Sequence, residues 1–213
     1  MPSLMEKLDE CFRDNLIGLV RRFVDVYREA TESLPSGCRE RALAAIPKGG
    51  VQARRLVFAS GRPERGIYIV EIDTVYVSLT WEWRPRRPSD VIGTISHEFR
   101  HRQQFTMILL LKEAQRAIND VLRTYGEWLP GELGLSLYHF REVVECDANE
   151  VKSRVLTQLS IVDFEGSCDE ALREAVKIVA SAMCKEFMCE DLSVEGAARY
   201  FLRVYKRECG ERK

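Results

Sequence analysis

His97-Glu98-Phe99-Arg100-His101 is the stretch that decides how this chain is interpreted. It follows the pattern HExxH and contains two of the three histidines among 213 residues. Because side chains four residues apart lie on one face of an α-helix, both imidazoles would point the same way. Two neutral imidazoles can bind one Zn²⁺, and the glutamate between them can act as general base on zinc-bound water. The motif therefore predicts a zinc site on a helix.

The sequence before the motif predicts a small β-sheet. Residues 51–80 contain runs rich in β-branched and aromatic residues, which favour strands and are separated by glycine and proline. Three strands are expected, at 55–59, 66–72 and 74–79. Residues 83–88 contain two prolines and break the pattern, and Ser89 or Asp90 is the expected N-cap of the motif helix. The motif is thus expected on a helix that follows the sheet.

A catalytic zinc ion needs a third protein ligand and leaves one position open for water or substrate. Residues 105–125 predict a long amphipathic helix, and Gly126, Pro130, Gly131 and Gly134 predict a loop that turns the chain back. Residues 138–158 then predict a second helix with several metal-ligating side chains. From spacing alone, Glu145, Glu142 and His139 all remain candidates for the third ligand.

Two short segments carry a resemblance to a known family. Residues 97–104 resemble an HExRHxxQ form of the motif, and Glu145-Cys-Asp-Ala-Asn149 resembles an ExDAN pattern. Both are typical of gluzincins, in particular small intracellular ImmA/IrrE-like peptidases and related phage and archaeal proteins, over about residues 51–158. The resemblance implies that His97, His101 and Glu145 bind zinc and that Glu98 is the base. Gln104 stands where a metzincin requires glycine, which excludes that branch.

Other polar residues near these segments have candidate roles. Tyr138 and His139 could stabilise the negative oxygen that develops during hydrolysis, so both are predicted as catalytic. Three residues of the second helix could orient the ligating histidines by accepting a hydrogen bond from the other ring N–H: Glu142, Asp147 and Asn149. Arg100 is interpreted as a solvated or salt-bridged helix residue.

Composition limits the remaining choices. The chain is expected to form one domain over residues 1–213, with helical flanks at 1–50 and 159–213 around a core at 51–158. The N-terminal flank predicts one helix over Leu4–Ser33 and a shorter one over Cys38–Ile46. A net charge of −1 gives no sign of nucleic-acid binding. Without a signal pattern or a long apolar run, a cytoplasmic protein without membrane segments is expected.

Seven cysteines are present, and none forms a CxxC pair. In an intracellular chain they are interpreted as buried thiols. Arginine greatly outnumbers lysine, which points weakly to a thermophile, where intracellular disulfides do occur.

The sequence as a whole predicts an α+β, zincin-like fold with a small, mostly antiparallel sheet. The predicted function is a zinc-dependent metallopeptidase with one Zn²⁺ per chain, acting on an unknown intracellular protein or peptide. The alternative is a catalytically weak or inactive zincin-like module that binds metal or a protein partner. The oligomeric state and the substrate are not indicated.

Overall fold

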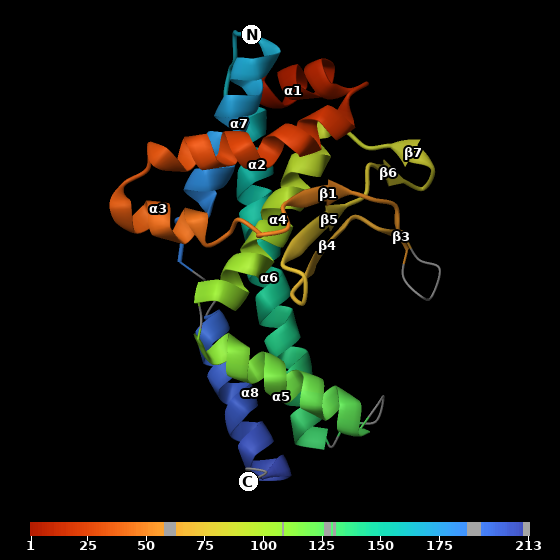
Figure 1. Cartoon of the computed structure of the whole chain (residues 1–213), viewed down its shortest axis with the longest axis vertical. Helices are drawn as coiled ribbons and strands as arrows, with labels where there is room; N and C mark the ends of the chain where they lie inside the picture. Colours follow the sequence, from red (N-terminus) through yellow and green to blue (C-terminus); the bar gives the residue numbers. More distant parts are fainter. Residues whose placement is uncertain (58–62, 108, 126–128, 130, 187–192, 211–213) are drawn as a thin grey trace. The chain divides into compact units, whose positions relative to one another are not determined.

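The structure is a computed structural model that describes residues 1–57, 63–107, 109–125, 129, 131–186 and 193–210. The helices and strands follow in chain order (Figure 1): α1 (Leu4–Phe12), α2 (Leu16–Glu32), α3 (Ser36–Leu43), β1 (Val51–Ala53), β2 (Leu56–Val57), β3 (Pro63–Glu64), β4 (Gly66–Ile69), β5 (Thr74–Val77), β6 (Thr80–Trp81), β7 (Arg84–Pro85), α4 (Pro88–Met107), α5 (Leu109–Tyr125), α6 (Gly131–Ile161), α7 (Cys168–Ala182) and α8 (Val194–Cys209).

The prediction of an α+β fold is confirmed, but the predicted sheet needs a correction. The main sheet has the strand order β1-β5-β4 and is mixed, not mostly antiparallel. β4 pairs antiparallel with β5, whereas β1 pairs parallel with it, Val51 lying opposite Val75. The local hairpin β2–β3 is formed separately, so β1 pairs with a strand further along the chain. All four residues of β5 are buried, which explains its run of apolar residues.

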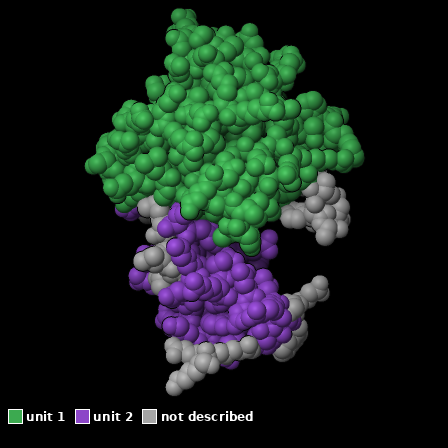
Figure 2. Space-filling view, in the orientation of Figure 1, with its two compact units in different colours: residues 1–103, 148–185 green, residues 104–147, 186–213 purple. Residues whose placement is uncertain are grey.

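The chain divides into two compact units, which Figure 2 shows in different colours. The first, unit 1, contains residues 1–103 and 148–185, and the second, unit 2, contains residues 104–147 and 186–213. Each unit has its own cluster of buried hydrophobic side chains. The predicted single domain, with its boundaries at residues 50 and 158, stays a prediction.

In unit 1, an aromatic cluster connects the N-terminal helices to the motif helix. Phe99 is fully buried, and its ring meets Phe23 and Tyr27 edge-on at centroid distances of 5.7 and 5.2 Å. Burying a phenylalanine of this kind contributes about 2–3 kcal/mol, and the edge contacts add to it. Phe99 thereby anchors α4 from within the HExxH motif itself.

Several predicted boundaries are corrected. The single helix expected over Leu4–Ser33 is two helices, because Asn15 caps α2 by accepting a 3.0 Å hydrogen bond from the Gly18 amide. α4 already begins at Pro88, and α6 begins at Gly131 instead of near residue 138. The expected break at 83–88 overlaps the hairpin β6–β7, whose turn residues Glu82 and Trp83 both have positive φ.

The remaining expected strands are only partly found. The strand expected at 74–79 is β5, which ends at Val77, and the strand expected at 66–72 is β4, which ends at Ile69. Of the strand expected at 55–59, β2 forms the part at 56–57, and residues 58–59 lie outside the described residues. In unit 2, α5 packs with α8, and Phe140 of α6 packs against Phe201 at a ring-centroid distance of 6.1 Å.

Over the described part of the chain, no helix combines the length and the apolar character that crossing a membrane requires.

The turn between β4 and β5 is fixed to α4 by one ion pair. Both oxygens of Asp73 accept hydrogen bonds of 2.9 Å from Arg102, and Tyr68 donates its hydroxyl proton to the same carboxylate at 2.9 Å. The Arg102 guanidinium is the largest cause that lowers the pKa of Asp73, to about 2. A carboxylate with a depressed pKa stabilises the fold above its unfolded value of about 3.9, and the contribution is lost as the pH falls.

We expect the free energy of unfolding to decrease as the pH falls from about 4 to 2, and Asp73→Asn to remove this part of the pH dependence. At pH 7 the variant should lose roughly 2 kcal/mol or more, since the buried Arg102 guanidinium loses its carboxylate counter-charge. Urea unfolding at several pH values measures both effects. Asp25→Asn, which affects an exposed ion pair, is the control and should change stability by less than about 1 kcal/mol. Equal stability of Asp73→Asn and wild type at pH 7 would contradict the interpretation.

Candidate metal centre

His97 and His101 lie one turn apart on α4, as the motif predicted. Their Nε2 atoms are 3.0 Å apart, and their rings are nearly perpendicular, with centroids 4.5 Å apart. Both side chains are half-buried. In the absence of a metal this contact is a hydrogen bond in which one ring nitrogen donates and the other accepts. The two nitrogens thus point to a common position, which is the arrangement that two imidazole ligands need.

Glu145 of α6 completes a group with the two histidines. Each of the three residues offers one ligand atom, and these atoms all lie within 4.8 Å of one another. Among the described residues, this is the one such group of three or more His, Cys, Asp or Glu side chains. Zinc bonds of about 2.0–2.2 Å in tetrahedral geometry place ligand atoms about 3.4 Å apart, so small side-chain adjustments would suffice. Two imidazoles and one carboxylate leave a fourth position open and fit catalytic zinc.

The two rivals for the third position are not in this group. Glu142 is exposed. His139 lies six residues before Glu145, and at 100° per residue that spacing places it on another face of α6. Its ring meets Tyr200 edge-on at a centroid distance of 6.1 Å. Of the three candidates for third ligand, the structure therefore favours Glu145.

Glu98 lies against the edge of the main sheet. Its side chain is buried, at 5% exposure. A Cβ atom added to Gly66, the first residue of β4, would lie 3.0 Å from Glu98 Oε1 and 2.4 Å from Thr94 Cγ2. Only glycine fits there, because any side chain would collide with α4. The sheet thus positions the predicted base by direct contact.

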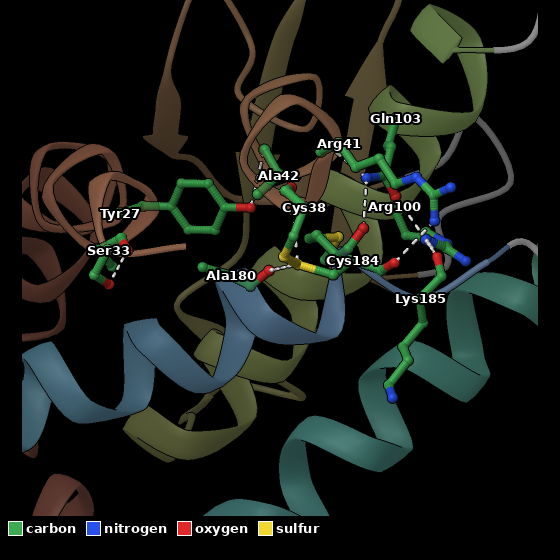
Figure 3. The surroundings of a disulfide bond; sticks show 12 residues. Tyr27, Ser33, Cys38, Arg41, Ala42, Arg100, Gln103, Ala180, Cys184 and Lys185 are labelled. Atoms are coloured by element: carbon green, nitrogen blue, oxygen red, sulfur yellow. Dashed lines mark hydrogen bonds between the residues drawn. A yellow bond between two sulfur atoms is a disulfide. The ribbon is translucent and has the colours of Figure 1, made fainter. Parts of the chain in front are cut away.

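The sequence did not predict the anchoring of Arg100. Its side chain is only 1% exposed, which shows that the solvated alternative of that interpretation is wrong. Arg100 Nη1 donates to Gln103 Oε1 at 2.6 Å and to the Lys185 carbonyl at 3.0 Å, and Figure 3 shows these contacts. Gln103 donates in turn to the Arg41 and Met183 carbonyls, at 2.6 and 2.8 Å. A buried guanidinium and amide need such partners, so they fix the helix against its neighbours.

Gln104 holds the part of α6 that surrounds Glu145. Its Nε2 donates to the Val144 carbonyl at 3.1 Å and to Asp147 Oδ2 at 2.7 Å, and both Gln104 and Asp147 are buried. These two acceptors flank Glu145 in the chain. Asp147, which the sequence nominated for orienting a histidine, binds Gln104. Gln104 lies seven residues after His97, on the face of the helix that carries both histidines, and this position was the available signal for its role.

A cationic group near Glu98 was also missed. Lys152 of α6 is half-buried, and its pKa is lowered first by burial and then by Arg65 and Arg86, while Asp90 and Glu98 oppose the shift. Arg86 is itself buried and donates to the carbonyls of Arg65, Ser78 and Asp90, and burial lowers its pKa to about 10. The predicted base is therefore electrostatically coupled to a lysine from the second helix.

Tyr138 and His139 keep their predicted catalytic roles as predictions. Seven residues correspond to nearly two helical turns, so Tyr138 lies on the same face of α6 as Glu145, about 10 Å earlier along the axis. Its side chain is 63% exposed. The hydroxyl is accessible to a ligand, whereas the ring of His139 packs on Tyr200. Of the two, Tyr138 is the better candidate for contact with a substrate.

Comparison with known proteins gives no independent indication of the family or function of this chain. No protein-family model, no curated protein and no solved structure matches this chain. The function is therefore argued from the site itself.

We expect Gln104→Ala to weaken zinc binding by about 10- to 100-fold, the usual cost of removing a residue that supports metal ligands. The reason is that Val144 and Asp147, on either side of Glu145, lose their shared donor. Isothermal titration with ZnCl₂ measures the affinity. Gln115→Ala removes a surface glutamine that binds Asn119 on α5, and it should leave the affinity unchanged. If the two variants bind zinc equally well, Gln104 does not support the site.

Proposed function

We propose that this protein is a zinc-dependent metallopeptidase whose ligands are His97, His101 and Glu145. The observation that carries the proposal is the grouping of these three side chains, which two separate sequence motifs had nominated. The intact Glu98 beside them supports hydrolysis over simple metal storage, because a purely structural site has no need of a base. A structural zinc site would also be closed by four protein ligands.

The residues have distinct roles in the proposed reaction. Zinc bound here would supply Lewis acidity, polarising a carbonyl and lowering the pKa of a nearby water molecule. Glu98 takes the proton from that water and delivers it to the leaving amine. The burial of Glu98 against Gly66 keeps the carboxylate in one place through both steps. Tyr138 is the candidate donor to the oxygen of the tetrahedral intermediate.

The sheet suggests how a peptide would be held. β4 is the last strand of the main sheet, and among the described strands it pairs only with β5. Its first residue contacts Glu98. An extended peptide that adds to a sheet edge forms main-chain hydrogen bonds whatever its side chains. A peptide on β4 would thus pass beside the predicted base, which supports a protein or peptide substrate.

Zinc stoichiometry tests the ligand set. Wild type should contain about one zinc per chain, and Glu145→Ala should lose it, because two imidazoles alone bind zinc weakly. Elemental analysis after reconstitution and desalting gives the ratio. Glu142→Ala is the matched control, since this glutamate lies one turn earlier on α6, is exposed and stands outside the group. No zinc in wild type would overturn the proposal, and zinc retained in Glu145→Ala would reassign the third ligand.

Glu98→Gln tests the reaction. The amide keeps the shape of the carboxylate but cannot take a proton, so zinc content should stay at the wild-type level. Hydrolysis of a fluorogenic peptide library should fall by about 10²- to 10⁴-fold. Equal turnover by the variant would remove Glu98 from the reaction. A wild-type protein that holds zinc and cleaves nothing in the library would favour the metal-binding module instead.

A further inference from the structure

The Cys38–Cys184 disulfide stands next to the contacts that hold the motif helix. It joins α3 to the second residue after the end of α7, across a sequence separation of 146. Both cysteines are partly exposed, so a small reductant can reach the bond. Figure 3 shows the disulfide together with the residues around it.

Three consecutive backbone carbonyls directly after α7 accept side-chain hydrogen bonds, and we call them the cradle. They belong to Met183, Cys184 and Lys185. They accept hydrogen bonds from Gln103 at 2.8 Å, Arg41 at 3.2 Å and Arg100 at 3.0 Å, respectively. Arg41 lies one turn after Cys38 on α3, and its carbonyl accepts from Gln103. The disulfide thus closes a ring of contacts among α3, the cradle and α4.

We propose that the Cys38–Cys184 disulfide makes metal binding at the proposed zinc site dependent on redox state. With the bond formed, the cradle holds Arg100 and Gln103, which stand on either side of His101 in the chain. A dithiol reductant breaks the S–S bond, delivers two electrons and two protons to give two thiols, and closes into its own disulfide. The end of α7 is then free to separate from α3, α4 loses its anchors, and zinc affinity falls. This inference rests on the proposed function.

The chain contains a matched control. Cys11–Cys168 joins α1 to the first residue of the same helix α7, with a sequence separation of 157. The loop entropy that a disulfide removes depends on the logarithm of loop length, so the two bonds should contribute almost equally to stability. Only Cys38–Cys184 adjoins the cradle. Comparing the two separates an effect on the metal from a general loss of stability.

The test compares the full-length variants Cys38→Ser/Cys184→Ser and Cys11→Ser/Cys168→Ser. Zinc affinity is measured by competition with a chromogenic chelator, and Co²⁺ absorption reports ligand geometry. We expect about 10-fold weaker zinc binding and an altered Co²⁺ spectrum in the first variant, and wild-type behaviour in the second. Both should lose similar stability in thermal denaturation. Gln103→Ala, which keeps the disulfide, should weaken zinc binding in the same direction.

Reduction of wild type by dithiothreitol completes the design. Cys146, beside Glu145, is also disulfide-bonded, so reduction alone would not identify the responsible bond. The effect of dithiothreitol on zinc affinity should therefore be clearly smaller in Cys38→Ser/Cys184→Ser than in wild type. Equal zinc affinities of the two serine variants would overturn the inference while leaving the zinc site standing. A wild type that binds no zinc would overturn the proposed function and this inference together.

Discussion

The structure depends on one requirement: the buried polar side chains of α4 must each find hydrogen-bond partners. Directly around and after the second histidine, α4 carries four buried polar residues, Arg100, Arg102, Gln103 and Gln104. Arg100 and Gln103 bind the carbonyls that follow α7, Arg102 binds Asp73, and Gln104 binds α6. Leaving any of these groups unsatisfied would cost more than its hydrogen bonds contribute. The HExxH helix is therefore held at a fixed rotation by directional contacts, and hydrophobic packing through Phe99 completes the fit.

The motif helix and the central strand could be predicted because each follows from a strong local pattern. Thr74–Val77 is a run of β-strand formers, and the histidine spacing suits one helix face. The parallel pairing of β1 with β5 could not be predicted, because it depends on which strand the rest of the fold brings next to β1, and no local sequence pattern shows that. The split between α1 and α2 had a visible signal in Asn15, but the apolar stripe continues across it and predicts one helix.

At the candidate site, the residue types that metal chemistry requires could be predicted. The hydrogen bonds that hold the surrounding helices in place could not. His97, His101 and Glu145 are recognised by type and spacing, but the partners of Gln104 are 40 and 43 residues away. The cysteine pairs are separated by 146 and 157 residues, beyond the reach of any local pattern. Such bonds occur in oxidising compartments or in hyperthermophiles.

The Cys11–Cys168 and Cys38–Cys184 disulfides also determine how a cleaved chain would behave. Cys11 is bonded to Cys168, and Cys38 to Cys184. A single cut at any peptide bond from Cys11 to Cys184 therefore leaves two fragments that remain covalently joined. If this protein cleaves itself or is cleaved there by another protease, the product migrates as a single full-size band on a non-reducing gel. It separates into two fragments only after reduction. Processing within that span would therefore be missed on a non-reducing gel.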